Sequence, residues 1–134
     1  MATVQEHLKK AEHNEKFFVC LLSDKSDPFL DWVITGMFYS ALHYIRALAA
    51  QHGFKNVSSY AQIDRLFSTL TMFKHNKKVY ISYRRLKDFS RNARYEMEDF
   101  TRKEVEELEK EDFQNIKTFV LSYFQASSTT QPGS

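Results

Sequence analysis

Apolar residues recur at three- and four-residue steps along most of the chain, which is the spacing of one face of an α-helix. The second such stretch, from Pro28 to about Gln51, is apolar around most of its circumference, which is typical of a helix surrounded by others. We therefore expect Trp32, near its start, to be largely buried. The first stretch runs from Val4 to about Ser23, with apolar positions at Val4, Leu8, Ala11, Phe17, Phe18, Leu21 and Leu22.

Four residues predict the ends and the packing of the second helix. Asp27 is placed to cap it, and Pro28 occupies the first helical position. Gly53 is placed to end it in the left-handed conformation, which glycine adopts without strain. Gly36, inside the helix, predicts that a neighbouring helix approaches closely at this point.

Three more helices are predicted toward the end of the chain. A shorter one spans about 59–73, and a longer one spans about Val79–Met97 with a strongly basic outer face. Thr101, with Glu104 three residues later, has the spacing of a capping box. The last helix is therefore expected to run from about Thr101 to Gln125.

Together these patterns predict an all-α fold, an antiparallel up-and-down bundle of four to five helices with the second and fourth helices at its centre. Residues 1–125 are expected to form a single domain, and residues 126–134 a disordered tail. The composition agrees, because 12 Phe, 7 Tyr and 1 Trp stand against only 3 Gly and 2 Pro. Such a balance suits long helices better than strands joined by tight turns.

Cysteine usage and hydropathy bound the cellular setting. Cys20 is the only cysteine, so no disulfide can form within the chain, and we expect a buried thiol in an intracellular protein. The first residues are polar and charged, and no apolar run reaches the length needed to span a membrane. The prediction is a cytoplasmic protein without a membrane contact.

Highly specific catalytic motifs are absent from the sequence, which has no glycine-rich phosphate loop and no nucleophile elbow. The five histidines stand at positions 7, 13, 43, 52 and 75, and no two of them have the spacing of zinc ligands on a helix. We therefore expect neither a metal ion nor another cofactor.

Two segments, FYSALHYIRALAAQHG at 38–53 and YRRLKDFSRNARYEMEDFT at 83–101, are the most distinctive in the chain. Together with the first helix they present three loose motifs in a fixed order, carried by His7, Ala11, Trp32, Phe38, Tyr39, Ala41, His43, Ser90, Ala93, Arg94 and Tyr95. In these motifs the chain resembles the HEPN family over nearly its whole length. The resemblance implies an all-α bundle, a homodimer, and a place in toxin–antitoxin or defence modules beside a nucleotidyltransferase-type antitoxin.

The resemblance also raises the question of catalysis, because many HEPN members are metal-independent ribonucleases. Their active site is an Arg followed, four to six residues later, by a His at the dimer cleft. Arg91 resembles the start of this motif, but positions 96–98 hold no histidine. A second Arg-to-His spacing runs from Arg46 to His52, away from the usual motif position. Arg46, His52 and Arg91 are therefore the catalytic candidates if the chain is an enzyme.

Charge is unevenly distributed in the second half of the chain. Residues 74–94 hold eight Lys and Arg against a single acid, Asp88, whereas residues 95–112 hold nine acids against three bases. The basic segment is a candidate phosphate-binding surface. Alternatively, two neighbouring antiparallel helices of opposite charge neutralise each other and stabilise the bundle weakly. Both interpretations stay open at this point.

Ligand-binding candidates follow from the helical spacing of the basic segment. Arginine can hold a phosphate while a nearby tyrosine ring stacks on a base. On the structural alternative, Arg94 bridges to Glu98 and Tyr95 belongs to the core. His43 on the second helix is either a ligand contact or a core histidine with satisfied hydrogen bonds. The residues that share one face of the fourth helix are Arg84, Asp88, Arg91 and Tyr95, with Arg94 beside them.

Three functions are compatible with these observations. The favoured one is an RNA- or nucleotide-binding HEPN module, as a component of a toxin–antitoxin or defence system. The second is a HEPN ribonuclease with a non-standard active site, which would be a metal-independent endoribonuclease. The third is a non-catalytic structural bundle that mediates protein interactions.

Overall fold

The computed structural model describes residues 2–26, 29–96 and 98–129, and the described residues form helices and no strands. This confirms the all-α prediction. The elements are α1 (Val4–Ser23), α2 (Leu30–Gln51), α3 (Tyr60–Thr69), α4 (Thr71–Lys74), α5 (Lys77–Tyr95), α6 (Arg102–Glu107), a π-helical segment (Leu108–Phe113) and α7 (Gln114–Thr129). Asp27 and Pro28, predicted to begin the second helix, lie outside the described residues.

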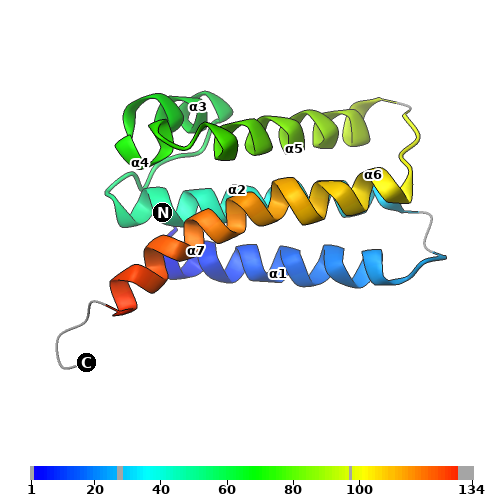
Figure 1. The fold of residues 1–134 in the computed structure, drawn as a ribbon, viewed down its shortest axis with the longest axis horizontal. Helices are drawn as coiled ribbons and strands as arrows, with labels where there is room; N and C mark the ends of the chain where they lie inside the picture. The colour runs from blue at the N-terminus through cyan, green and yellow to red at the C-terminus, as the bar shows by residue number, and fades with distance from the viewer. Residues whose placement is uncertain (1, 27–28, 97, 130–134) are drawn as a thin grey trace.

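The long helices form an up-and-down bundle in which α2 contacts α1, α5 and α7 (Figure 1). Successive long helices run in opposite directions, and α3 and α4 lie together at one end, beside the start of α5 (Figure 1). The prediction of an antiparallel bundle with α2 at its centre is confirmed. By contrast, α5 buries one face only, so it covers the core and does not lie at its centre.

Capping accounts for several helix boundaries. The predicted box is present at the start of α6, where the backbone N–H of Glu104 donates to the Thr101 hydroxyl at 3.1 Å and the backbone N–H of Thr101 donates to the Glu104 carboxylate at 3.0 Å. At the end of α2, Gly53 has φ of 91°. Its N–H donates to the Ala50 carbonyl, and the next N–H donates to Ala49, which is a Schellman motif. Both sequence predictions are therefore confirmed.

Two boundaries differ from the prediction. The helix expected over 59–73 is divided into α3 and α4 at Leu70, whose extended backbone (ψ of 124°) interrupts it. The last helix continues to Thr129, beyond its expected end at Gln125 and into the segment predicted to be a tail, and residues 130–134 lie outside the described part of the chain.

The last helix also contains a π-helical segment that was not predicted. Buried apolar residues in this helix follow a step of five between Leu108 and Phe113, whereas an α-helix places steps of three or four on one face. The wider π turn accommodates the extra residue and keeps both side chains in the core. It also turns Asp112 inward, where its carboxylate accepts hydrogen bonds from Ser82 at 2.9 Å and Arg85 at 3.0 Å.

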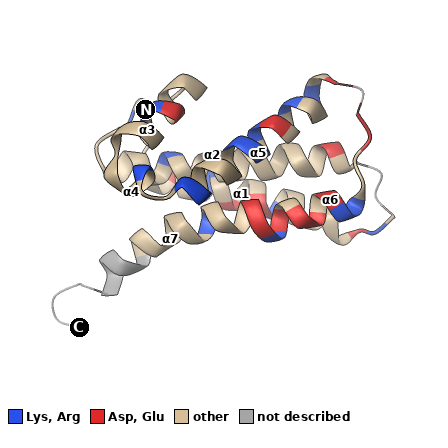
Figure 2. Ribbon diagram, turned by 45° about the horizontal axis from the view of Figure 1, so that its top comes forward, with Lys and Arg blue, Asp and Glu red and all other residues tan. Residues whose placement is uncertain are grey.

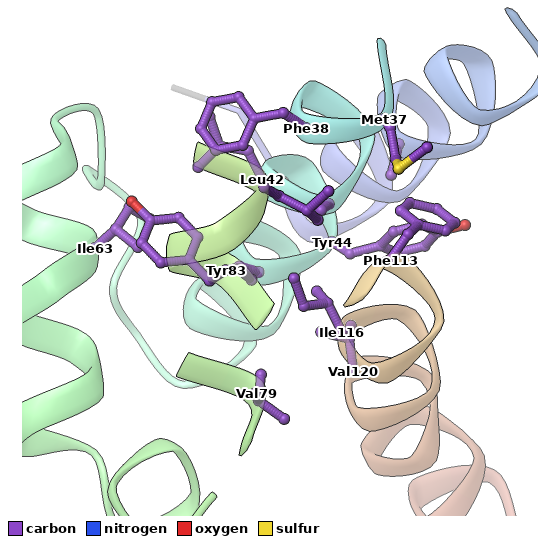
Figure 3. Close-up of a cluster of buried hydrophobic side chains, with 14 of the residues drawn as sticks. Met37, Phe38, Leu42, Tyr44, Ile63, Val79, Tyr83, Phe113, Ile116 and Val120 are labelled. Atoms are coloured by element: carbon purple, nitrogen blue, oxygen red, sulfur yellow. The ribbon is translucent and has the colours of Figure 1, made fainter. Parts of the chain in front are cut away.

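The core is assembled around α2 and is rich in aromatic rings (Figure 3). On one side of α2, the rings of Phe18 and Phe113 pack edge to face with centroids 4.9 Å apart. On the other side, Phe67 stacks on Tyr83 at 5.5 Å. Aromatic side chains from α1, α3, α5 and the last helix therefore meet the apolar surface of α2, and their burial is the main source of stability.

The close approach predicted at Gly36 is confirmed. A Cβ atom added to this glycine would lie 3.0 Å from Cδ2 of Phe17 and 3.2 Å from Cβ of Phe18. The absence of a side chain at Gly36 therefore lets α1 pack directly against the backbone of α2.

The burial expected for two residues is wrong. Trp32 is 55% exposed, and Cys20 is also exposed. Helix α2 is not fully surrounded, because the face between α1 and α5 is left open along one stripe. This stripe, the α2 open stripe, consists of Trp32, Thr35, Tyr39, His43 and Arg46.

Two buried tyrosines generate a matched prediction of stability. The Tyr44 hydroxyl donates to the Glu15 carboxylate at 2.8 Å, whereas the Tyr83 hydroxyl is buried without a hydrogen-bond partner among the described residues. We expect Tyr44→Phe to lower the free energy of unfolding by about 1–2 kcal/mol, because a hydrogen bond to a charged group is lost. Tyr83→Phe should be neutral or stabilising. Urea unfolding of both variants tests this, and a loss on Tyr83→Phe equal to that on Tyr44→Phe would contradict it.

Candidate functional site

The outer face of α5 carries the charged residues that the helical spacing grouped together. The structure buries Tyr83 and Leu86 on the opposite side of this helix. Tyr95 is 73% exposed, so its interpretation as a core residue is wrong. Figure 2 shows the basic positions along α5 and the acidic ones along α6 and the segment after it. The exposed side chains on the outer face of α5 include Arg84, Asp88, Arg91 and Tyr95.

Arg94, at the end of α5, is held by two tyrosine rings. Its guanidinium carbon lies 5.6 Å from the ring centroid of Tyr39 and 5.1 Å from that of Tyr95. One Nη donates to the Tyr39 hydroxyl at 3.0 Å, and Nε donates to the Ser90 carbonyl at 3.3 Å. No ion pair with Glu98 occurs in the described structure, so the predicted bridge is wrong. The guanidinium of Arg94 is therefore held in place, while three of its five N–H groups donate no hydrogen bond within the described structure and can bind a ligand.

The same pairing of a cation with a tyrosine recurs along α5. Arg84 donates to the Tyr80 hydroxyl at 3.1 Å and lies over the ring of Tyr80. The ammonium of Lys87 lies 4.9 Å from the ring centroid of Tyr60 on α3. Arg91 lies between these positions and Arg94 and makes no hydrogen bond, ion pair or ring contact with any described residue. We call the surface made by Arg84, Lys87, Arg91, Arg94 and their tyrosines, Tyr80, Tyr60, Tyr39 and Tyr95, the tyrosine–cation face.

The opposite edge of α5 is neutralised by the last helix. Arg85 forms an ion pair with Asp112 at 3.0 Å, and its guanidinium also lies over the ring of Phe89. Among the described residues the remaining ion pair joins Lys117 to Glu15, away from α5. Mutual neutralisation of the basic and acidic helices therefore applies to one edge of α5 and not to the tyrosine–cation face.

His43 has a partner that the sequence did not indicate. Its Nδ1 lies 3.1 Å from Nδ1 of His7 on α1. One ring must donate and the other accept, so the two imidazoles hold opposite tautomers. Burial lowers the pKa of His7, and the positive charge of Arg46 lowers it further. The same two causes, in the same order, lower the pKa of His43 to about 4. Near neutral pH His43 is therefore an uncharged, hydrogen-bonded histidine, in line with its interpretation as a satisfied histidine.

His7 could have been found from its place on the first helix. It precedes Ala11 by four residues and Phe18 by eleven, so it lies on the stripe that α1 buries. A histidine on such a stripe needs a polar partner from another helix. The identity of that partner, 36 residues away in the chain, requires the packing of α1 against α2.

A family model described as the HEPN domain matches residues 4–121. The chain belongs to the HEPN family. The resemblance of the three sequence motifs is thereby confirmed over nearly the whole chain. Neither the curated proteins nor the solved structures contain a match to it.

The catalytic candidates of this HEPN domain are not assembled into one site. Arg46 donates to the Ser58 carbonyl at 3.3 Å, while His52 is exposed and its Nδ1 lies 3.0 Å from the Leu48 carbonyl. No contact joins Arg46 to His52 within the described structure. After Arg91, the described positions 96 and 98 are exposed glutamates. The histidines near Arg46 are His43 and His7, and not His52. The positive charge of Arg46 disfavours the protonated forms of both.

No cluster of three or more metal-ligating side chains occurs among the residues that the structure describes. Within the same residues, no helix is long and apolar enough to cross a membrane.

The histidine pair makes stability depend on pH. The pKa of His43 is about 4 in the folded protein and about 6.5 in the unfolded chain, so on acidification the unfolded state binds the proton first. The contribution of the neutral His43 to the free energy of unfolding is fully present above pH 6.5 and is lost as the pH falls from 6.5 toward 4. We expect His43→Asn to show a smaller loss of stability across this window than wild type, measured by urea unfolding at several pH values. Equal slopes for the two proteins would contradict the assignment.

Proposed function

We propose that this HEPN domain is an RNA- or nucleotide-binding module that uses the tyrosine–cation face of α5, with single-stranded RNA as its best-fitting ligand. The observation that carries the proposal is the repeated pairing of a cation with a tyrosine ring along one exposed face. Such a face offers charge to the phosphates and flat rings to unstacked bases.

The charges on this face are available to a ligand. Arg91 has no partner among the described residues, and Arg94 is held by neutral tyrosines. Arg85, on the opposite edge of α5, is instead paired with Asp112. Asp88, exposed on this face, and Asp64 of α3, which also acts on the charge of Arg84, would repel a phosphate there.

The ribonuclease alternative has less support. A general acid–base step needs a titratable group beside the substrate, and the described residues after Arg91 supply glutamate and not histidine. Cleavage of RNA without added metal should nevertheless be assayed beside binding, since it would favour this alternative.

The setting proposed for the module rests on its family. Membership of the HEPN family supports a cytoplasmic role in a toxin–antitoxin or defence system with a nucleotidyltransferase-type antitoxin as partner. A nucleotidyltransferase gene beside the gene for this chain, and co-purification of the two products, would support this part of the proposal.

A homodimer is the second part of the proposal. Phe17 and Trp32 are 46% and 55% exposed, and they line a pocket of about 350 Å³ between α1 and α2. Two exposed aromatic side chains around one hollow are typical of an interface, because burying them removes apolar surface from water. A second copy packed over this pocket would bury both Phe17 and Trp32.

RNA binding should show a steep dependence on salt. Each neutralised phosphate of a single strand contributes about 0.7 to the slope of log affinity against log salt. We expect Arg91→Ala with Arg94→Ala to weaken binding of a fluorescent single-stranded RNA and to reduce this slope by about 1.4. Asp88→Asn should act in the opposite direction and tighten binding. Fluorescence anisotropy over a salt series measures both effects.

The matched control is Lys16→Ala with Lys103→Ala, which removes the same charge from exposed positions on α1 and α6. It should leave the salt slope unchanged, while circular dichroism confirms that both double variants fold. Equal losses in the two double variants, or wild-type binding that does not depend on salt, would refute the assignment of the face.

Dimerisation can be followed through the single tryptophan. If a second copy covers Trp32, its emission should shift to shorter wavelength as the protein concentration rises, because the indole leaves water. Phe17→Ser should suppress the shift and give a monomer by light scattering. A monomeric mass for wild type at micromolar concentration would contradict the dimer.

A further inference from the structure

A polar pocket, separate from the one beside Trp32, lies where the start of α1 meets the last turns of α2 and the loop after it. Its volume is about 260 Å³, and its lining includes His7, Arg46, Lys55, Asn56 and Ser58. None of the described residues that line it is an acid. The pocket therefore combines two permanent cations and a histidine without a carboxylate to balance them.

The charge of Arg46 is not compensated by any described carboxylate. Its side chain is half-buried, and desolvation lowers its pKa. Its Nε is buried without a hydrogen-bond partner among the described residues, and its Nη2 donates a long hydrogen bond of 3.3 Å to the Ser58 carbonyl. Burying an arginine that lacks an anion is costly, because neither water nor a carboxylate compensates the charge.

The histidine pair is affected by the same excess of positive charge. Arg46 disfavours protonation of both rings, and Lys10 adds to this effect at His43. The acid that favours a charged His7 is Glu6, whose carboxylate is already engaged by the backbone of Thr3 as a helix cap. An anion in the pocket would compensate Arg46 and would make a proton on His7 favourable.

We propose that this pocket binds a phosphoryl group, carried by inorganic phosphate, by a nucleoside monophosphate or by the 5′ end of an RNA. The terminal Nη groups of a guanidinium can hold two phosphoryl oxygens side by side, while Lys55 and His7 contribute further donors. The site does not rest on RNA binding by α5, since no residue is shared between the pocket and the tyrosine–cation face.

Isothermal titration calorimetry with sulfate and with inorganic phosphate tests the site. Sulfate keeps its charge between pH 6 and 8, so any change in its affinity over this range belongs to the protein. We expect saturable binding of both anions, and tighter sulfate binding at pH 6 than at pH 8 because the histidine pair takes up a proton with the anion. A wild-type protein that binds neither anion saturably would overturn the proposal.

Variants assign the binding to the pocket. Arg46→Gln should weaken anion binding by about tenfold or more, the loss expected for a charge-assisted hydrogen bond. Lys55→Ala, at an exposed position, should weaken it several-fold and serves if Arg46→Gln does not fold. Lys16→Ala is the matched control and should bind as wild type. Equal affinity in Lys55→Ala, Lys16→Ala and wild type would also overturn the proposal.

Two comparisons distinguish the sources of the phosphoryl group. Competition with sulfate by AMP but not by adenosine would support a nucleotide, and tighter binding of 5′-phosphorylated than of 5′-hydroxyl RNA would support an RNA end. The Arg91→Ala, Arg94→Ala variant should keep its sulfate affinity. Loss of sulfate binding in that variant would overturn the independence of the two sites, whereas loss of RNA binding alone concerns the α5 face.

Discussion

The direct contact of α1 with the backbone of α2 sets the register on which the rest of the structure depends. Gly36 lies against Phe17 and Phe18, and one turn later the Ser40 hydroxyl donates to the Ala11 carbonyl at 2.8 Å. Small side chains at both points let the two helices approach closely. In this antiparallel register the next pair to meet is His43 with His7, so the histidine contact follows from the two contacts before it.

The second organising feature is that α5 has two chemically different edges. One edge is tied to the last helix by Arg85 and Asp112, and the π turn is what brings Asp112 into reach. The other edge carries cations whose neighbours are tyrosines from α2, α3 and α5 itself. A single basic helix can therefore stabilise the bundle on one side and present charge to solvent on the other, and the two interpretations of its charge are not exclusive.

Much of the fold could be predicted because it depends on local patterns. Helical spacing located the long helices, and the capping box at Thr101 and the glycine at Gly53 identified two of their ends. Burial was harder to predict, since Trp32 is apolar in character but lies where no described helix covers α2. The candidate site was predicted in part: the shared face of α5 follows from spacing, whereas Tyr39 and Tyr60 reach its cations only through tertiary packing.

The hydrogen bond between the two histidines has a consequence for the surfaces on either side of it. His43 lines the pocket beside Trp32, and His7 lines the pocket beside Arg46. With both rings neutral, a single Nδ1 proton is shared across 3.1 Å, and the ring that accepts it must carry its own proton on Nε2. Moving the shared proton from one ring to the other, with the matching exchange at Nε2, changes which of the two imidazoles has a donor at Nε2 and which has an acceptor there. The two rings, each beside a different pocket, can therefore exchange their hydrogen-bonding character without any change in net charge.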